Sequence, residues 1–240
     1  MRLDKYLSLN HNCTRNRAQF FIEQGLVLVN KILAKKSSYD VIESDVVEIL
    51  DDKRVGFVSR SAVKLDTFLD EIGLDVSGMI CLDIGASTGG FTQVLLGRGA
   101  AWVQTVDVGT LQLHPSIRSD SRVVCTENTD IRDFRTEASF DIVVGDISFI
   151  SLAKLMDSIL SLATLETEII LLYKPQFEVG SPNLRKTGVP KSEAIVLKYF
   201  QEFQTFLREE GVTIKKISLS AIEGEAGNRE YMMWFQKKES

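Results

Sequence analysis

Short apolar runs alternate with helix-length amphipathic segments from Ser61 to the end of the chain. Five of these runs have the length of strands and read MICLDI, WVQTVDV, RVVCTE, DIVVGD and EIILLY. Strands separated by helix-length segments pair in parallel beneath helices on both faces, so the pattern predicts an α/β fold with a mostly parallel sheet. A last strand, EYMMWF, follows the Gly227–Asn228 turn, and its short connection to its predecessor predicts an antiparallel direction.

The first sixty residues show a different pattern. RLDKYLSL predicts one helix, and TRNRAQFFIEQG predicts a second with Thr14 as its N-cap, an apolar stripe on one face and its arginines on the other. GLVLVN and DVVEIL then suit short strands. DDKRVGFVSR, residues 51–60, is charged and aperiodic and reads as a linker. We therefore expect a small α+β domain over residues 1–58 and a large domain over residues 59–240.

Composition and charge modify this picture only in the small domain. The chain has 240 residues, of which 44% are hydrophobic and 25% charged, as in ordinary globular proteins. Its net charge of −5 is uneven, because residues 1–60 carry ten Lys and Arg against eight Asp and Glu, and the excess of acid lies in the rest. A cationic head on an acidic body keeps a nucleic-acid partner open for the head.

Cysteine and histidine usage points to a cytoplasmic protein without a metal. Cys13, Cys81 and Cys125 are scattered and form no CxxC pair, which favours reduced thiols. The two histidines lie about a hundred residues apart, so a zinc site has little support. MRLDKYL lacks the apolar core of a signal peptide, and no run approaches the ~18 apolar residues of a membrane span. We expect a soluble protein that requires no membrane.

Charged residues close four of the predicted strands: Asp83, Asp107, Asp146 and Lys174. The carboxyl ends of parallel strands meet at one edge of a sheet, where ligands bind, so these residues predict a charged crevice. Lys174 follows an uncharged run and needs an anionic partner if it is buried. Asp146 closes the strand expected beside it, so the two could meet.

The first of these strand ends opens a glycine-rich turn, DIGASTGGF at residues 83–91. Small residues let the backbone approach a ligand, although a purely structural turn uses them as well. A dinucleotide site would need G-x-G-x-x-G, and Ser87 stands at the second glycine position. Asp107 could accept both hydroxyls of a ribose, so S-adenosylmethionine fits better than NAD.

This turn resembles motif I of Rossmann-like methyltransferases. The resemblance implies that Asp107 is the ribose carboxylate and that Asp130, in ENTDIR, occupies the adenine position; the alternative for Asp130 is a helix cap. The cofactor-binding residues implied in this way are Asp83, Gly85, Ala86, Ser87, Thr88, Gly89, Gly90, Phe91, Asp107, Asp130, Ile131 and Asp146.

RLDKYL, TRNRAQFFIEQGLVLVN and DVVEI, in this order, resemble the S4 RNA-binding module, with Lys31 where that module usually has glycine. The resemblance implies contacts to structured RNA through phosphates and shape, while a solvated charged face is the other interpretation. Basic residues of a loop after Lys174 belong either to a substrate-facing lid or to a solvated loop. The candidate RNA-binding residues are Arg2, Lys5, Arg15, Arg17, Lys31, Lys35, Lys36, Arg60, Arg185 and Lys186.

Lys64 and Glu230 extend the charged crevice. Lys64 lies in the first turn of a helix starting at Ser61, where the helix dipole disfavours a cation, and Glu230 begins the last strand at the crevice edge. Taken singly, each could be an ordinary surface charge. Together with Asp146 and Lys174, in this order, they resemble the K-D-K-E catalytic tetrad of FtsJ-like ribose 2'-O-methyltransferases.

With VSRSAVKL, DIGASTGGFT, GDISFIS, LLYKPQFE and GNREYMMW in order, the chain resembles the TlyA (haemolysin A) family of rRNA methyltransferases over essentially its whole length. The resemblance implies a Rossmann-like domain with a seven-stranded sheet. It also implies methyl transfer from S-adenosylmethionine to the ribose 2'-hydroxyl of a cytidine in ribosomal RNA, with 23S rRNA expected first and 16S rRNA as a further target. The partner is ribosomal RNA or a ribosomal subunit. Oligomeric state and the identity of the base, Lys64 or Lys174, stay open.

Four rival functions explain less of the chain. A non-catalytic S4-type RNA binder leaves the glycine-rich turn and the tetrad without a purpose. A membrane-active haemolysin needs a strongly apolar helix or hairpin. A pseudouridine synthase with an S4 head has another catalytic fold, and an NAD-dependent oxidoreductase needs a hydride-handling site beside the turn.

Overall fold

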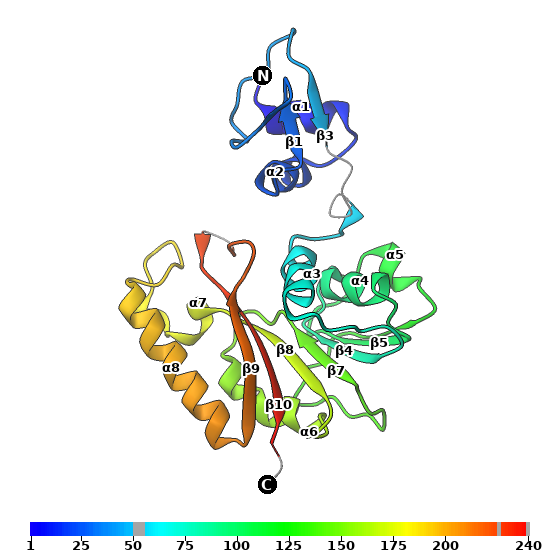
Figure 1. The fold of residues 1–240 in the computed structure, drawn as a ribbon, viewed down its shortest axis with the longest axis vertical. Helices are drawn as coiled ribbons and strands as arrows, with labels where there is room; N and C mark the ends of the chain where they lie inside the picture. Colours follow the sequence, from blue (N-terminus) through cyan, green and yellow to red (C-terminus); the bar gives the residue numbers. More distant parts are fainter. Residues whose placement is uncertain (50–55, 225–226, 239–240) are drawn as a thin grey trace. The chain divides into compact units, whose positions relative to one another are not determined.

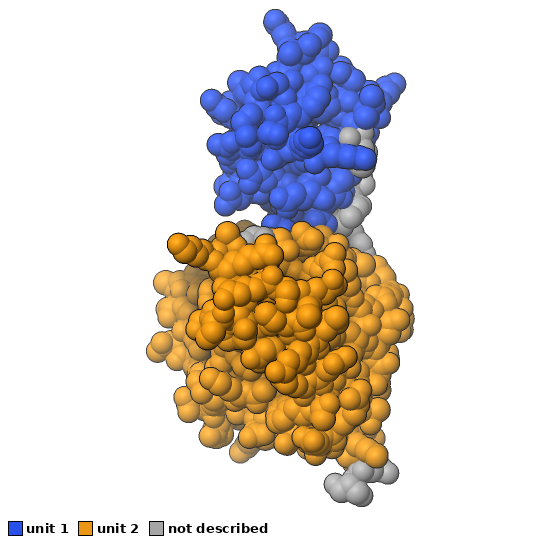
Figure 2. Space-filling model, turned by 90° about the vertical axis from the view of Figure 1, so that its left-hand side faces the viewer, with its two compact units in different colours: residues 1–60 blue, residues 61–240 orange. Residues whose placement is uncertain are grey.

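The computed structural model describes residues 1–49, 56–224 and 227–238. The chain divides into two compact units, Met1–Arg60 and Ser61–Ser240, which Figure 2 shows in different colours. The first five residues of the expected linker lie outside the described residues. The domain boundary between residues 58 and 59 stays a prediction.

The first unit packs two helices with a three-stranded antiparallel sheet of order β2-β1-β3. The Thr14 hydroxyl accepts a hydrogen bond from the Arg17 backbone N–H at 3.2 Å, which confirms the predicted N-cap. Strands β1 and β2 form a hairpin whose two turn residues, Asn30 and Lys31, have φ of 51° and 65°. The elements are α1 Leu3–Asn10, α2 Arg15–Glu23, β1 Val27–Val29, β2 Ile32–Leu33 and β3 Val47–Ile49.

The second unit is built on a seven-stranded sheet of order β6-β5-β4-β7-β8-β10-β9 (Figure 1). Strands β6 to β8 pair in parallel, and β10 is antiparallel to its neighbours β8 and β9, so the predicted sheet is confirmed. The strand β9 was not among the runs picked out from the sequence. The strands are β4 Ile80–Ile84, β5 Trp102–Val106, β6 Val123–Thr126, β7 Ile142–Gly145, β8 Glu168–Tyr173, β9 Val212–Leu219 and β10 Tyr231–Lys237.

Helices cover the sheet from two sides, with α6 and α8 on one side and α3, α4 and α5 on the other in Figure 1. Aromatic residues of α8, Phe200 and Phe203, pack on Tyr173 of β8 in the main hydrophobic core. No described helix is long and apolar enough to span a membrane. The helices are α3 Ser61–Ile72, α4 Gly90–Gly97, α5 Pro115–Arg118, α6 Met156–Ser161, α7 Pro175–Glu178 and α8 Glu193–Glu209, with 3-10 turns at Leu152–Lys154 and Ser181–Asn183.

The strand order brings distant parts of the chain to one edge. In the antiparallel pair of β8 and β10, Tyr173 lies opposite Tyr231. Lys174 directly follows Tyr173 and Glu230 directly precedes Tyr231, so the two residues emerge at the same end of the sheet. Asp83 and Asp146 lie at the corresponding ends of β4 and β7, which are neighbouring parallel strands.

Candidate active site

A pocket of about 360 Å³ opens at the carboxyl ends of β4, β5 and β7. Six of the twelve residues expected to bind the cofactor line it: Gly85, Ser87, Asp107, Asp130, Ile131 and Asp146. The sequence gave no signal for several other lining residues, which come from loops after the strands. These are Val108, Gln112, Thr129, Ile147, Ser148, Phe149, Ile150 and Leu155.

Backbone geometry explains the small residues of the turn after β4. Gly85 has φ of 73°, and a Cβ atom there would lie 3.3 Å from the Ile147 Cα atom. Ser87 also has a positive φ, 47°, and its N–H donates to Asp107 Oδ2 at 2.7 Å. Gly109 N–H donates to the other Asp107 oxygen at 2.7 Å. These two amides fix the Asp107 carboxylate at the pocket wall.

Asp83 lies beneath this turn and is fully buried. Its Oδ2 accepts hydrogen bonds from the Thr92 N–H at 2.9 Å and the Thr92 hydroxyl at 2.6 Å. Within the described part of the chain, Oδ1 has no hydrogen-bond partner. Burial raises the pKa of Asp83 to about 7, against the opposing effect of the Thr92 bonds. A buried carboxylate with an unused oxygen suits a cationic ligand.

The other residues expected at the cofactor divide into two groups. Asp130 accepts hydrogen bonds from the backbone and side chain of Arg132 at 2.7–2.9 Å while also lining the pocket, so both interpretations of this residue describe part of its environment. Thr88 is exposed in the turn but does not line the pocket. The remaining four are buried and support the turn from below: Ala86, Gly89, Gly90 and Phe91.

Lys64 and Glu230 form a buried ion pair, with Nζ 2.6 Å from Oε2. Lys64 belongs to α3 and is 7% exposed, while Glu230 precedes β10 and is 2% exposed. The interpretation of either residue as a solvated surface charge is therefore wrong. A charge pair this well buried is stable only because each partner compensates the other.

Lys174 and Asp146 form a second ion pair, with Nζ 2.7 Å from Oδ1. The lysine is 7% exposed, and its Nζ also donates to the Ser148 hydroxyl at 2.6 Å. Asp146 lines the 360 Å³ pocket, so this pair stands at the pocket wall. The lysine that ends LLYK thus has the anionic company that its burial demands.

Gln176, which sequence reasoning missed, links the two ion pairs. It lies in α7, two residues after Lys174, and its Nε2 donates to Glu230 Oε1 at 2.8 Å. Its own Oε1 is buried and has no hydrogen-bond partner among the described residues. Glu230 is therefore held from one side by Lys64 and from the other by Gln176.

Phe149 is a second feature that the sequence did not reveal. It lines the pocket three residues after Asp146, yet it is 91% exposed and has a positive φ of 68°. Bulky residues rarely adopt this conformation, and they persist in it mainly at functional sites. Its ring lies 5.3 Å from that of Phe177, which in turn lies 5.7 Å from the Lys174 Nζ.

A second pocket, of about 310 Å³, borders the same residues. Pro175 lines it directly after Lys174, and Arg229 and Tyr231 line it on either side of Glu230. Arg185, from the loop with candidate RNA contacts, lies in its wall, and Lys186 is exposed beside it. Basic side chains thus gather next to the two ion pairs.

Comparison with known proteins identifies this arrangement. The FtsJ-like methyltransferase model matches residues 57–237, and the S4 domain model matches residues 1–47. A relative from Campylobacter jejuni, "23S rRNA (cytidine-2'-O)-methyltransferase TlyA", is 38% identical over 99% of this chain and 100% of its own. The chain belongs to the TlyA family. The resemblance drawn from its motifs is confirmed, and the large unit is a methyltransferase domain.

Two further TlyA relatives agree. The "16S/23S rRNA (cytidine-2'-O)-methyltransferase TlyA" of Mycobacterium tuberculosis is 37% identical, over 93% of this chain and 84% of that protein. A solved structure from Streptococcus thermophilus, described as a haemolysin, has a TM-score of 0.75 at 32% identity. That match covers 100% of this chain and 89% of the other.

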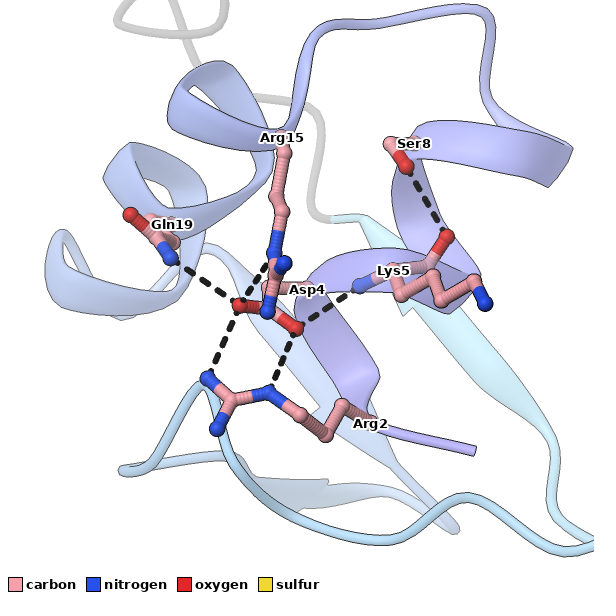
Figure 3. Close-up of polar contacts among 6 residues, drawn as sticks. All are labelled: Arg2, Asp4, Lys5, Ser8, Arg15 and Gln19. Carbon is pink, nitrogen blue, oxygen red and sulfur yellow. Dashed lines mark hydrogen bonds and ion pairs between the residues drawn. The ribbon is translucent and has the colours of Figure 1, made fainter.

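The S4 domain of this TlyA protein organises its basic residues around one acid, Asp4. This carboxylate is 0% exposed, and it accepts hydrogen bonds from Arg2, Arg15 and Gln19 (Figure 3). The Arg2 hydrogen bonds, the largest cause, hold the pKa of Asp4 well below its usual range. Arg2 and Arg15 are therefore solvent-facing cations with a fixed anchor, with side chains 45% and 53% exposed.

Arg17 lies elsewhere than the sequence suggested. Its guanidinium carbon is 5.4 Å from the Phe20 ring centre and 4.9 Å from that of Phe21, and it donates to the Phe57 carbonyl. The prediction that it shares the face away from the apolar stripe is wrong, because an arginine stem packs on apolar surface as readily as it extends into water. Arg60 pairs with Glu23 at 3.2 Å. The exposed lysines of the set are Lys5, Lys31, Lys35 and Lys36.

Proposed function

We propose that this TlyA protein transfers a methyl group from S-adenosylmethionine to the ribose 2'-hydroxyl of a cytidine in ribosomal RNA. The observation that carries the proposal is the pair of buried lysine–carboxylate bridges, Lys64–Glu230 and Lys174–Asp146, one of which reaches the wall of the 360 Å³ pocket. The printed activities of the relatives from Campylobacter and Mycobacterium support the same reaction, with 23S rRNA as the first target to test.

The pocket fits the cofactor in charge. S-adenosylmethionine supplies a methyl group already activated by its positively charged sulfur. Asp107 is held where it can accept ribose hydroxyls, and the free oxygen of Asp83 can accept a hydrogen bond from an ammonium group. Asp146 adds a third carboxylate at the wall. Small turn residues allow the backbone amides to approach a carboxylate.

The two lysines divide the work on the acceptor. A ribose hydroxyl is a poor nucleophile, so its oxygen must be oriented and its proton removed. Lys174, in its neutral form, takes that proton on Nζ, and Asp146 and Ser148 hold the amine in place. Lys64 stabilises the negative charge that develops on the oxygen, while Glu230 and Gln176 orient Lys64.

Features around this site suit RNA. Phe149 presents an exposed ring at the pocket mouth on which a base can stack, and single bases stack on aromatic side chains in many RNA complexes. Arg185 and Arg229, at the second pocket, can contact neighbouring phosphates. The S4 domain supplies further cations that position structured RNA. We place the reaction on ribosomes in the cytoplasm.

The test combines labelled S-adenosylmethionine with isolated large subunits, small subunits and protein-free rRNA, followed by mapping of the modified nucleotide. We expect a 2'-O-methylcytidine, formed by the wild-type protein and lost in Lys174→Ala. Methylation of a base, or no methyl transfer although the protein binds the cofactor in calorimetry, would overturn the proposal. Near-normal activity of a folded Lys174→Ala variant would remove the assigned base.

A further inference from the structure

The Asp4 cluster of the S4 domain has an unusual division of labour. One buried carboxylate serves several donors, of which two are arginines from different segments of the chain (Figure 3). Arg2 precedes α1 and binds both oxygens, through Nε at 3.1 Å and one terminal nitrogen at 3.0 Å. Arg15 begins α2 and binds through Nε at 3.0 Å. Asp4 therefore joins the starts of the two helices.

The outward nitrogens of these arginines remain available. The second terminal nitrogen of Arg2, and both of Arg15, donate no hydrogen bond to any residue in the described ranges. Gln19, at 2.9 Å, and the Lys5 backbone N–H, at 2.8 Å, complete the acceptor capacity of Asp4. The result is two guanidinium groups with fixed bases, about half exposed, and with donors turned to the solvent.

We propose that Asp4 is a positioning residue that sets Arg2 and Arg15 as one clamp for a backbone phosphate of structured RNA. This inference rests on the proposed function, since it takes ribosomal RNA as the ligand. Arginine suits the task because its planar fork stays charged and binds phosphate oxygens in a fixed geometry. Two free arginines would repel each other and lose rotamer freedom on binding; the shared carboxylate removes part of both costs beforehand.

The proposal makes a prediction opposite to that of simple electrostatics. Asp4 is an anion at an RNA-binding surface, so its neutralisation raises the positive charge and should tighten RNA binding if charge alone mattered. If Asp4 sets the geometry, the same change weakens binding. The matched control is Glu43→Gln, which removes the same charge from an exposed acid of the same unit that makes no ion pair among the described residues.

The experiment measures the affinity of the full-length protein for a protein-free 23S rRNA fragment at fixed salt. We expect Asp4→Asn to bind about tenfold more weakly than wild type, and Glu43→Gln to bind equally or slightly more tightly. Tighter binding by Asp4→Asn, or equal behaviour of the two variants, would overturn the clamp. Wild-type protein that neither binds nor methylates rRNA would instead overturn the proposed function.

A merely structural role for Asp4 is separated by a double-mutant cycle. In an Arg2→Gln/Arg15→Gln background, the clamp is absent, so adding Asp4→Asn should change RNA affinity by less than about twofold. If Asp4→Asn acts by loosening the S4 domain, the tenfold loss persists in that background, and the inference is wrong. Thermal unfolding of each variant, followed alongside, reports the folded fraction, and cofactor affinity serves as the internal check on the methyltransferase domain.

Discussion

The two units of the molecule use the same ingredients, cations and carboxylates, in opposite ways. In the S4 domain, one fully buried acid anchors two arginines whose side chains are 45% and 53% exposed. In the methyltransferase domain, each lysine has its own carboxylate, and both lysines are only 7% exposed. The first arrangement displays charge to the solvent, and the second encloses it.

The choice of cation explains the difference. An arginine is always charged and offers a rigid fork, which suits repeated, sequence-independent contact with phosphate. A lysine can give up its proton when its surroundings allow it, which suits proton transfer. The comparison therefore predicts that lysine and arginine are not interchangeable in this protein, and that the penalty for exchange is larger in the enclosed site.

The largest effect is expected from exchanging the two cations. Lys174→Arg keeps the charge but removes the group that can take a proton, so kcat should fall by about a thousandfold while cofactor and RNA affinity persist. Arg15→Lys should weaken RNA binding by less than about tenfold. Single-turnover methyl transfer and RNA titration measure the two. Lys215→Arg, at an ion pair with Glu168 of 2.8 Å, is the control and should stay active.

Gln176→Leu should have the next largest effect. It leaves Glu230 Oε1 buried without its 2.8 Å donor, so the Lys64–Glu230 pair loses its orientation. We expect kcat to fall about ten- to a hundredfold, with cofactor affinity unchanged in calorimetry. Gln236→Leu removes a comparable amide from β10 and should behave as wild type. Equal kcat for the two variants would remove Gln176 from the site.

A smaller effect is expected from pH. Burial raises the pKa of Asp83 to about 7, so this carboxyl is largely protonated near pH 6 and largely ionised near pH 8. A cationic cofactor favours the ionised form, so its affinity should rise up to about tenfold over this interval and level off above it. Asp83→Asn should flatten the profile. A flat profile for the wild type would separate Asp83 from cofactor binding.

The sign for stability runs the other way. The pKa of Asp83 in the folded chain, about 7, lies above the value of about 3.9 for an unfolded aspartate. Without cofactor, the folded form therefore retains its proton longer, and the contribution of Asp83 to stability declines as the pH rises from about 4 to about 7. Denaturant titrations at several pH values, with Asp83→Asn as the reference, measure this decline.

The smallest effect is expected at the hairpin of the S4 domain. Lys31 has φ of 65°, a conformation that costs a lysine energy but suits glycine. Lys31→Gly should raise the free energy of unfolding of this unit by about 0.5–1 kcal/mol. If Lys31 contacts phosphate, the same change lowers the salt dependence of RNA binding by about one unit in the log-log slope. An unchanged slope would show that Lys31 does not contact RNA.

The fold was largely predictable because its strands are marked by local patterns. Apolar runs bounded by turns located most strands of the sheet, and the short connection before EYMMWF gave its direction. The strand at Val212–Leu219 escaped because its side chains alternate with lysines and serine, as suits an edge strand, and its burial is correspondingly incomplete. No local pattern states that β10 lies between β8 and β9.

The site was predictable where the chain itself breaks a local rule. A lysine after an uncharged run and a lysine in a first helical turn both signal a demand from outside their own segment. Gln176 broke no such rule, and its partner Glu230 is 54 residues away, so only the folded chain shows the bond. Phe149 was equally hidden, because an aromatic residue gives no sign in sequence of a positive φ.

The position of β10 has a consequence for biosynthesis. This strand is inserted between β8 and β9 although it leaves the ribosome after every other strand of the sheet. Until then β8 and β9 lack the neighbour that joins them, and Lys64 lacks its counter-ion. A nascent or prematurely terminated polypeptide is therefore inert toward the very particles that are making it, and competence arrives only with the final dozen residues.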